Sequence, residues 1–295
     1  MLRQSLISNE QLALQVKLAL EEDIQSGDVT ASLIPTDKLV SADLFAREQA
    51  ILCGQDWVNE TFKQLDSDVK INWQANDSDR INPDQIICTF IGSAQSILTA
   101  ERTAINFLQT LSGTATETNR YVNEIAETQA KVLDTRKTIP GLRLAQKYAV
   151  ACGGGMNHRV GLYDMILIKE NHIEAAGSIE QALELADEKI QNNFISDDFP
   201  IEIEVETLKE LHAALNAGAK RILLDNMSND TLFEAVKINN SFSQDNNTEA
   251  AKLEASGNVS IESIKDIALT GVDFISIGGI TKHLHAIDFS LRFRD

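Results

Sequence analysis

Positively charged side chains gather in one stretch of an otherwise acidic chain. Residues 131–172 carry seven Lys/Arg against three Asp/Glu, a net charge of +4, whereas the 295-residue chain has a formal net charge of −18. Cations concentrated in this way predict a small polyanionic ligand, and the overall acidity argues against nucleic acid as the partner. A solvated helix face is the alternative, but Arg143 and Lys147 are four residues apart, where like charges repel unless an anion or acid relieves them.

A second set of charges follows a series of predicted strands. After residue 113, short β-rich runs alternate with helical stretches, which predicts parallel strands joined by right-handed crossovers. The runs are 132–134, 165–169, 201–206, 221–225, 252–254 and 273–277. They finish at or near Asp134, Lys169, Glu204, Asp225 and Glu254. Charges at the carboxyl ends of parallel strands mark the active-site face of an α/β barrel, and six runs instead of eight predict an incomplete barrel.

Two local patterns sharpen this expectation. Residues 201–206 read IEIEVE, which puts three carboxylates on one face of a strand, and each needs a cation, a metal or a ligand hydroxyl. Ser256-Gly257 and Gly278-Gly279 each follow a strand, where bare backbone N–H groups hold phosphate well. Glycine also serves plain turns, so local sequence leaves a phosphate site and a turn equally open.

The first 112 residues show a different order of predicted helices and strands. A helical pattern at 11–22 is followed by alternating stretches at 40–47, 68–73 and 85–90, which predicts helices packed on an antiparallel sheet. A helix over 97–112 is expected to end at Gly113. Its polar face carries Arg102, for which solvation and function are equally good interpretations. The polar stretches 191–198 and 239–248 are expected to be solvent loops.

The chain shows no pattern of export. Its N-terminus lacks an uninterrupted apolar core, and no apolar run approaches the length of a membrane span, which predicts a soluble protein. The three cysteines, Cys53, Cys88 and Cys152, show no paired spacing and indicate reduced thiols in the cytoplasm. Cys152 precedes three glycines without an evident activating base, so a small residue at a crowded backbone is favoured over a nucleophile.

Several long motifs, taken in order, carry a resemblance to one family. They are EEDIQSGDVT (21–30), TAERTAINFLQTLSGTAT (99–116), DTRKTIPGLR (134–143), KYAVACGGGMNHRVGLYDMILIKENH (147–172), IEIEVE (201–206), LLDN (223–226), LEASGNVS (253–260) and ISIGGITKH (275–283). Over nearly its full length the chain resembles quinolinate phosphoribosyltransferase, also called carboxylating nicotinate-nucleotide pyrophosphorylase. The polar insert at 238–251 is longer than is usual in that family.

The resemblance implies an α/β fold in two parts. An N-terminal α/β sandwich domain, 1–112, is joined by the C-terminal residues 284–295, and residues 113–283 form an incomplete, about six-stranded α/β barrel that is the catalytic domain. It further implies a cytoplasmic homodimer with active sites completed across the interface, a need for Mg²⁺ but no organic cofactor, and no nucleic-acid or membrane partner.

The implied reaction is phosphoribosyl transfer from phosphoribosyl pyrophosphate to quinolinate with decarboxylation, giving nicotinate mononucleotide, pyrophosphate and CO₂ in NAD biosynthesis. By resemblance, the dicarboxylate is held by Arg136, His158, Arg159 and Lys169, with Arg102 from the neighbouring subunit. The residues around phosphoribosyl pyrophosphate, which are also the catalytic ones, are Lys137, Lys169, Glu204 and Asp225. The last two are expected to bind Mg²⁺ carried mainly by the substrate. The 5′-phosphate end is assigned to Ser256, Gly257, Gly278 and Gly279.

Two other functions stay open at this point. A related phosphoribosyltransferase acting on nicotinate or another anionic acceptor, without decarboxylation, would share the phosphoribosyl half of the site. A non-catalytic anion-binding protein on the same barrel is the second. It would not need Lys137, Lys169, Glu204 and Asp225 together, and all four are present.

Overall fold

In the computed structural model, which describes residues 6–191 and 200–294, the chain forms two compact units. Unit 1 comprises the described residues up to Asn119, then 138–154 and those from Ile280 on; unit 2 comprises 120–137 and the described part of 155–279. The chain therefore passes between the units more than once. No helix of the described residues is long and apolar enough to cross a membrane. Most of the predicted loop 191–198 lies outside the described residues.

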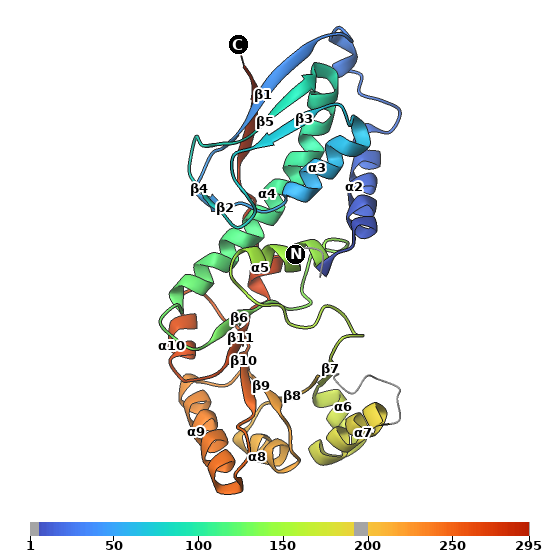
Figure 1. Ribbon diagram of the computed structural model, residues 1–295. Helices are drawn as coiled ribbons and strands as arrows, with labels where there is room; N and C mark the ends of the chain where they lie inside the picture. Colours follow the sequence, from blue (N-terminus) through green and yellow to red (C-terminus); the bar gives the residue numbers. More distant parts are fainter. Residues whose placement is uncertain (1–5, 192–199, 295) are drawn as a thin grey trace. The chain divides into compact units, whose positions relative to one another are not determined.

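Unit 1 is built on an antiparallel sheet of four strands in the order β12-β1-β5-β3 (Figure 1). The strand from the end of the chain pairs with the first one, with Ala42 opposite Phe293 and Ala46 opposite Phe289. Helices packed on an antiparallel sheet were predicted here, and that prediction is confirmed. The elements are α2 (Asn9–Ile24), β1 (Leu39–Ala46), β2 (Ala50–Ile51), α3 (Gln55–Leu65), β3 (Lys70–Trp73), β4 (Arg80–Ile81), β5 (Ile86–Ser93), α4 (Ala94–Glu124), α5 (Arg143–Cys152), α11 (Gly279–Lys282) and β12 (Phe289–Phe293), with a 3₁₀ turn at Ala31–Leu33.

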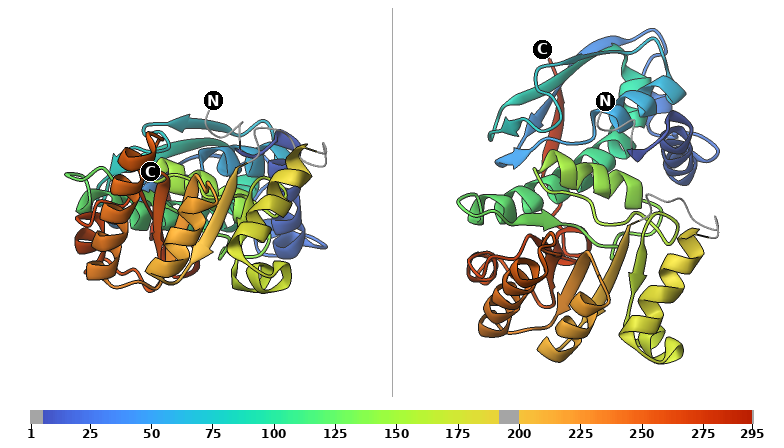
Figure 2. Two further views of the ribbon diagram at one scale, coloured as in Figure 1. Left: turned by 90° about the horizontal axis from the view of Figure 1, so that it is seen from below. Right: turned by 60° about the horizontal axis from the view of Figure 1, so that its bottom comes forward.

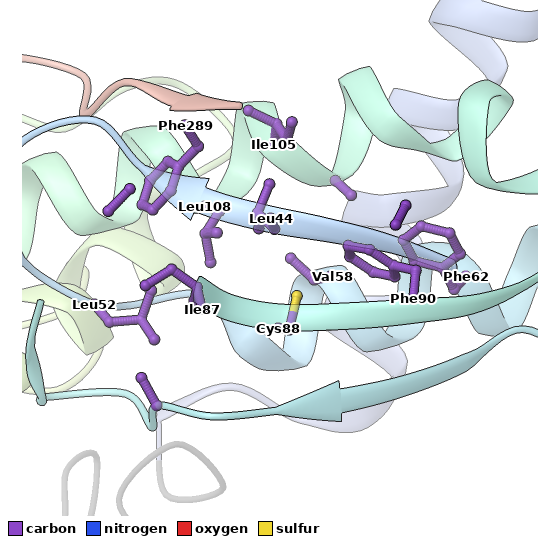
Figure 3. Packing of buried hydrophobic residues seen from close by; sticks show 14 of the residues in the cluster. Leu44, Leu52, Val58, Phe62, Ile87, Cys88, Phe90, Ile105, Leu108 and Phe289 are labelled. Atoms are coloured by element: carbon purple, nitrogen blue, oxygen red, sulfur yellow. The ribbon is translucent and has the colours of Figure 1, made fainter. Parts of the chain in front are cut away.

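The core of unit 1 lies between this sheet and the helices α3 and α4 (Figure 3). Phe62 of α3 stacks on Phe90 of β5 with ring centroids 4.6 Å apart, and both side chains are buried. Ile105 and Leu108, three residues apart on α4, point into the same cluster. Each such side chain stabilises the fold by roughly 1.5–3 kcal/mol. The long helix therefore packs an apolar face against the sheet.

The end predicted for that helix is wrong. Helix α4 runs from Ala94 to Glu124, straight through Gly113. A Cβ added at Gly113 would collide with the backbone carbonyl of His285, which lies against the helix at this point. The glycine serves the close approach of two backbone segments within unit 1 and does not terminate the helix.

Unit 2 contains a parallel sheet of six strands in the order β6-β11-β10-β9-β8-β7, and the helices that join the strands pack beside them (Figure 2). Each of the six predicted runs forms one strand, so the α/β architecture and the strand number are confirmed. The outer strands are β6 and β7, which makes this an open sheet. The elements are β6 (Lys131–Leu133), β7 (Ile166–Ile168), α6 (Glu170–Ala176), α7 (Ile179–Gln191), β8 (Ile201–Val205), α8 (Leu208–Asn216), β9 (Arg221–Asp225), α9 (Asn229–Asn246), β10 (Lys252–Ser256), α10 (Ile264–Ala268) and β11 (Phe274–Ser276).

The polar stretch 239–248 was predicted as a loop, and for residues 239–246 this is wrong. These residues form the end of α9, which stops at Asn247 in a left-handed conformation (φ 52°). Asn239 is buried; its Nδ2 donates to the Ala251 carbonyl at 2.8 Å, and its Oδ1 accepts from the Ala251 N–H at 3.1 Å. One buried amide thus ties a largely polar helix to the start of β10.

Candidate active site

The carboxyl ends of the strands of unit 2 bring several predicted site residues to one edge. In the register of the sheet, Glu204 pairs with Leu223 and Asp225 pairs with Ser256. Lys169 follows the last residue of β7, and its Nζ donates a hydrogen bond to Glu204 Oε2. Because the strands are parallel, these side chains come from equivalent ends of neighbouring strands. The expected alignment of charges along one edge is therefore present.

Two arginines of the predicted patch lie near enough for the charge of one to act on the other. Burial lowers the pKa of the Arg159 guanidinium, and the nearby positive charge of Arg136 lowers it further. The carboxylates of Asp164, Glu202 and Glu204 act in the opposite direction but do not cancel these effects. A pair of guanidiniums that repel each other is relieved by an anion bound between them, and the planar forks of arginine suit carboxylates.

The segment that carries Arg159 is fixed by a buried aspartate. Asp134, directly after β6, accepts from Asn157 Nδ2 at 2.7 Å and from the His158 backbone N–H at 2.9 Å. Farther along, Asp164 accepts from the N–H groups of Val160 and Gly161 at 2.6 and 2.8 Å. Asp134 was expected as a charge on the active-site face; in the structure it anchors the loop and is fully buried.

His158 belongs to a buried ionic network that sequence reasoning did not find as a unit. Its Nε2 lies 2.8 Å from Glu202 Oε2 and 3.6 Å from Glu254 Oε1. Arg221 joins both glutamates, from Nε to Glu202 at 2.9 Å and from Nη2 to Glu254 at 2.6 Å. Burial raises the pKa of Glu254 to about 7, and the nearby negative charge of Glu202 adds to that rise. The signal in the sequence was the alternation IEIEVE, in which each carboxylate needs a cation, a metal or a ligand hydroxyl.

The glycines predicted to face phosphate approach other site residues closely. A Cβ on Gly278 would lie 2.8 Å from Lys137 Cδ, so this glycine makes room for the lysine side chain. Gly257 has φ of +109°, and a Cβ there would lie 3.0 Å from the Cα of Asn226. Asn226 in turn donates from Nδ2 to Asp225 Oδ2 at 2.6 Å. Lys137 and Asn226 are thus each packed beside a bare backbone.

Three other basic residues considered in the sequence lie in unit 1. Arg102 is exposed on α4. Lys147 of α5 is fully buried, so a solvated helix face is the wrong interpretation for it. Arg143 donates from Nε to Thr138 Oγ1 at 3.2 Å.

Glu204 and Asp225 offer the donors that Mg²⁺ prefers. Both are carboxylates at the ends of adjacent strands, and Mg²⁺ in phosphate-transferring sites is bound by one or two carboxylates plus substrate oxygens. These two residues therefore fit an ion that arrives largely on the substrate. A groove beside Glu204 is unsuited to anionic substrates, because it is lined by Glu170, Ile173, Glu174, Glu204, Glu206 and Glu210.

Comparison with known proteins identifies the family. Residues 28–112 match the model of the N-terminal domain of quinolinate phosphoribosyl transferase, and residues 114–292 match that of its C-terminal domain. The chain belongs to the quinolinate phosphoribosyltransferase family. Named members of this family align with most of the chain, and solved structures of the family share its fold.

Two relatives and one structure show how close the likeness is. A quinolinate phosphoribosyltransferase [decarboxylating] 1b of Nicotiana tabacum is 39% identical, covering 94% of this chain and 81% of its own length. A probable nicotinate-nucleotide pyrophosphorylase [carboxylating] of Bacillus subtilis is 38% identical, covering 92% and 89%. The solved nicotinate-nucleotide pyrophosphorylase of Francisella tularensis is 46% identical, covers 98% of both chains and superposes with a TM-score of 0.91.

In this member of the quinolinate phosphoribosyltransferase family, the residues that the resemblance assigns to the substrates are distributed unevenly between the two units. All except Arg102 belong to unit 2. Their individual roles, and the domain limits 1–112, 113–283 and 284–295, stay predictions.

Proposed function

We propose that this chain transfers the phosphoribosyl group of phosphoribosyl pyrophosphate to the ring nitrogen of quinolinate and removes one carboxylate as CO₂, yielding nicotinate mononucleotide and pyrophosphate. The observation that carries the proposal is the positive charge of Arg136 near the partly buried guanidinium of Arg159, which is unfavourable to the charge of Arg159 until an anion binds. Quinolinate has two carboxylates on adjacent ring carbons, which two guanidinium forks can grip together.

The acceptor half of the proposed site contains Arg136, Arg159, His158 and Lys169. Arg102 completes it from the neighbouring subunit of a homodimer, since its exposed position on α4 leaves it available to a partner. In closed two-fold symmetry each subunit gives one arginine and receives one, so the dimer carries two complete sites.

The donor half contains Lys137, Lys169 and the turns that follow strands β10 and β11. Lysine point charges suit the pyrophosphate, and the bare backbone at Ser256, Gly257, Gly278 and Gly279 suits the 5′-phosphate. Glu204 and Asp225 would hold Mg²⁺ together with the substrate's oxygens, and the ion, when bound, supplies positive charge that balances the pyrophosphate.

The reaction needs positive charge at the leaving pyrophosphate and negative charge beside the ribose. As the bond from C1 to the pyrophosphate oxygen breaks, the sugar becomes oxocarbenium-like, and the carboxylates of Glu204 and Asp225 stabilise that developing cation. The lone pair of the pyridine nitrogen then forms the new bond to C1. The quaternised ring accepts the electron pair left when the neighbouring carboxylate departs as CO₂, and a proton replaces it on carbon.

We further propose a reducing compartment such as the cytoplasm for the enzyme. The cysteines Cys53, Cys88 and Cys152 are buried and free. Free buried thiols are the usual form in compartments that keep cysteines reduced.

Incubation of the purified chain with quinolinate, phosphoribosyl pyrophosphate and Mg²⁺ tests the proposal. The expected product is nicotinate mononucleotide. A parallel reaction with nicotinate as acceptor should give little product, because one of the two carboxylate contacts is missing. Faster reaction with nicotinate would favour the non-decarboxylating alternative, and quinolinate binding without any product would favour the anion-binding one.

A further inference from the structure

A layer of charged side chains crosses the parallel sheet one step below the proposed site. Glu202 of β8, Arg221 of β9 and Glu254 of β10 meet in this layer. The Arg221 guanidinium also lies over the ring of Phe274 of β11, 4.6 Å from its centroid. Four neighbouring strands therefore contribute one group each. Glu204 is two residues beyond Glu202, on the same side of β8.

The layer is too buried to be an ordinary surface ion pair. Neither Glu202 nor Glu254 exposes any of its side chain to solvent. Arg221 takes one oxygen of each carboxylate, at 2.9 and 2.6 Å. Because the guanidinium already holds both carboxylates together, it provides the positive charge that a metal ion would otherwise supply among these acids.

The oxygens that Arg221 does not hold face His158. Glu202 Oε2 lies 2.8 Å from His158 Nε2. Glu254 Oε1 is buried without a hydrogen-bond partner and lies 3.6 Å from the same nitrogen. Both carboxylates thus direct negative charge at one edge of the imidazole, which favours a hydrogen on Nε2.

The opposite edge of the ring is also engaged. His158 Nδ1 accepts a hydrogen bond from the backbone N–H of Arg159 at 2.7 Å. A nitrogen that accepts carries no hydrogen, so this contact places the ring hydrogen on Nε2, toward the two glutamates. Both edges of the ring are thus held by contacts within the protein.

From these contacts we propose that Glu202, Glu254 and Arg221 are positioning residues for the acceptor site, and that His158 is their relay. The buried carboxylates hold the imidazole in one orientation, and the imidazole holds the backbone of Arg159, whose guanidinium grips the substrate. The inference rests on the proposed function, because it assigns a role in binding that acceptor.

Kinetics of amide variants give one test. In Glu202→Gln the amide oxygen can accept from His158 or from Arg221 but not from both, so the imidazole is held less firmly. The KM for quinolinate should therefore rise about 10-fold, while the KM for phosphoribosyl pyrophosphate should change less than about 2-fold. Asp43→Asn is the matched control, since Asp43 in unit 1 is also a buried carboxylate bonded to an arginine, Arg294, at 2.6 Å. It should leave both KM values unchanged. Equal rises for both substrates in Glu202→Gln would mean general damage and would overturn the proposal.

The tautomer of His158 gives the second test and needs no turnover. Nitrogen-15 NMR of the histidine-labelled protein at about pH 8 should show His158 neutral, with hydrogen on Nε2, before and after quinolinate is added. The resonance is assigned from its loss in His158→Gln, or by elimination with variants of the other four histidines if that protein does not fold. A ring protonated on Nδ1, or one that changes its protonation on binding quinolinate, would contradict the relay. A protein that forms no nicotinate mononucleotide would instead refute the proposed function, whatever the tautomer.

Discussion

Lys169 Nζ donates a hydrogen bond to Glu204 Oε2 across the ends of the neighbouring strands β7 and β8. A cation needed for anionic substrates and a carboxylate suited to a developing cation are thus held together in the free protein. In the proposed reaction, a substrate anion would attract the lysine and so free the carboxylate for the ribose. The pair therefore links the two halves of the proposed reaction.

Removing the charge of Glu204 should separate binding from turnover. Glu204→Gln or Asp225→Asn should lower kcat by about 10²- to 10³-fold, the usual effect of losing one electrostatic contact to a transition state, while the Kd for quinolinate changes less than about 3-fold. Steady-state rates and quinolinate titrations measure both quantities. Glu206→Gln is the matched control, because Glu206 is exposed just beyond β8. Weakened quinolinate binding with normal turnover would place Glu204 and Asp225 in the wrong half of the site.

Replacing the arginine forks by lysine should weaken acceptor binding while the charge is kept. Arg136→Lys or Arg159→Lys should cost about 1.5–3 kcal/mol, or roughly 10- to 150-fold in the Kd for quinolinate, because a lysine cannot make the bidentate contact. Isothermal titration gives this value directly. Arg47→Lys, at a surface pair with Asp84, is the charge-preserving control. Quinolinate bound as tightly by Arg136→Lys as by the parent chain would refute the assignment.

The strands of unit 2 could be predicted because each is a short apolar run, and five of the six runs end at or near a charge. That pattern follows from local chemistry: a strand covered on both faces is apolar, and side chains that bind ligands come where it ends. The edge occupied by Lys169, Glu204 and Asp225 was for this reason visible in the sequence. Arg136 and Arg159 were likewise visible, as charges in an acidic chain.

The layer beneath that edge could not be predicted, because it depends on the register of separate strands. The sequence indicated that Glu202 needs a cation, a metal or a ligand hydroxyl, but nothing in it identified Arg221, which stands at the start of another run. The helix end predicted at Gly113 failed for a related reason. The backbone packed against Gly113 is a tertiary fact, whereas helix-ending rules use only local sequence.

Asp77 in unit 1 should make the stability of the fold depend on pH. It accepts from the N–H groups of Gly54 and Gln55 and from the Tyr148 hydroxyl at 2.8 Å, yet burial raises its pKa from 3.8 to about 6. The folded state therefore holds the proton more tightly than the unfolded state. This contribution to stability is complete below about pH 4 and is lost as pH rises through about 6, by up to about 3 kcal/mol.

Asp77→Asn isolates that effect, because the amide keeps an acceptor for the two N–H groups and carries no charge. The Tm of the variant minus that of the parent should grow as pH is raised from about 4 to about 7. Thermal unfolding in a series of buffers measures the difference. A difference that stays constant or shrinks would show that the Asp77 carboxyl does not titrate in this window.

Sharing of sites between subunits can be tested with two defective chains. Arg102→Ala and Lys137→Ala should each be nearly inactive alone, because every site in either homodimer lacks one group. In a mixed dimer one site carries both defects and the other carries neither, so up to about half of the activity per dimer should return. Subunits that demonstrably exchange but recover nothing would place Arg102 outside the neighbour's site.

The most direct test of the central claim is the stoichiometry of the products from quinolinate labelled with carbon-14 in the carboxylate next to the ring nitrogen. With phosphoribosyl pyrophosphate and Mg²⁺, the protein should release labelled CO₂ and pyrophosphate in equal amounts, and no CO₂ when phosphoribosyl pyrophosphate is left out. Pyrophosphate release without labelled CO₂, or CO₂ release that does not need phosphoribosyl pyrophosphate, would contradict decarboxylating phosphoribosyl transfer at this site.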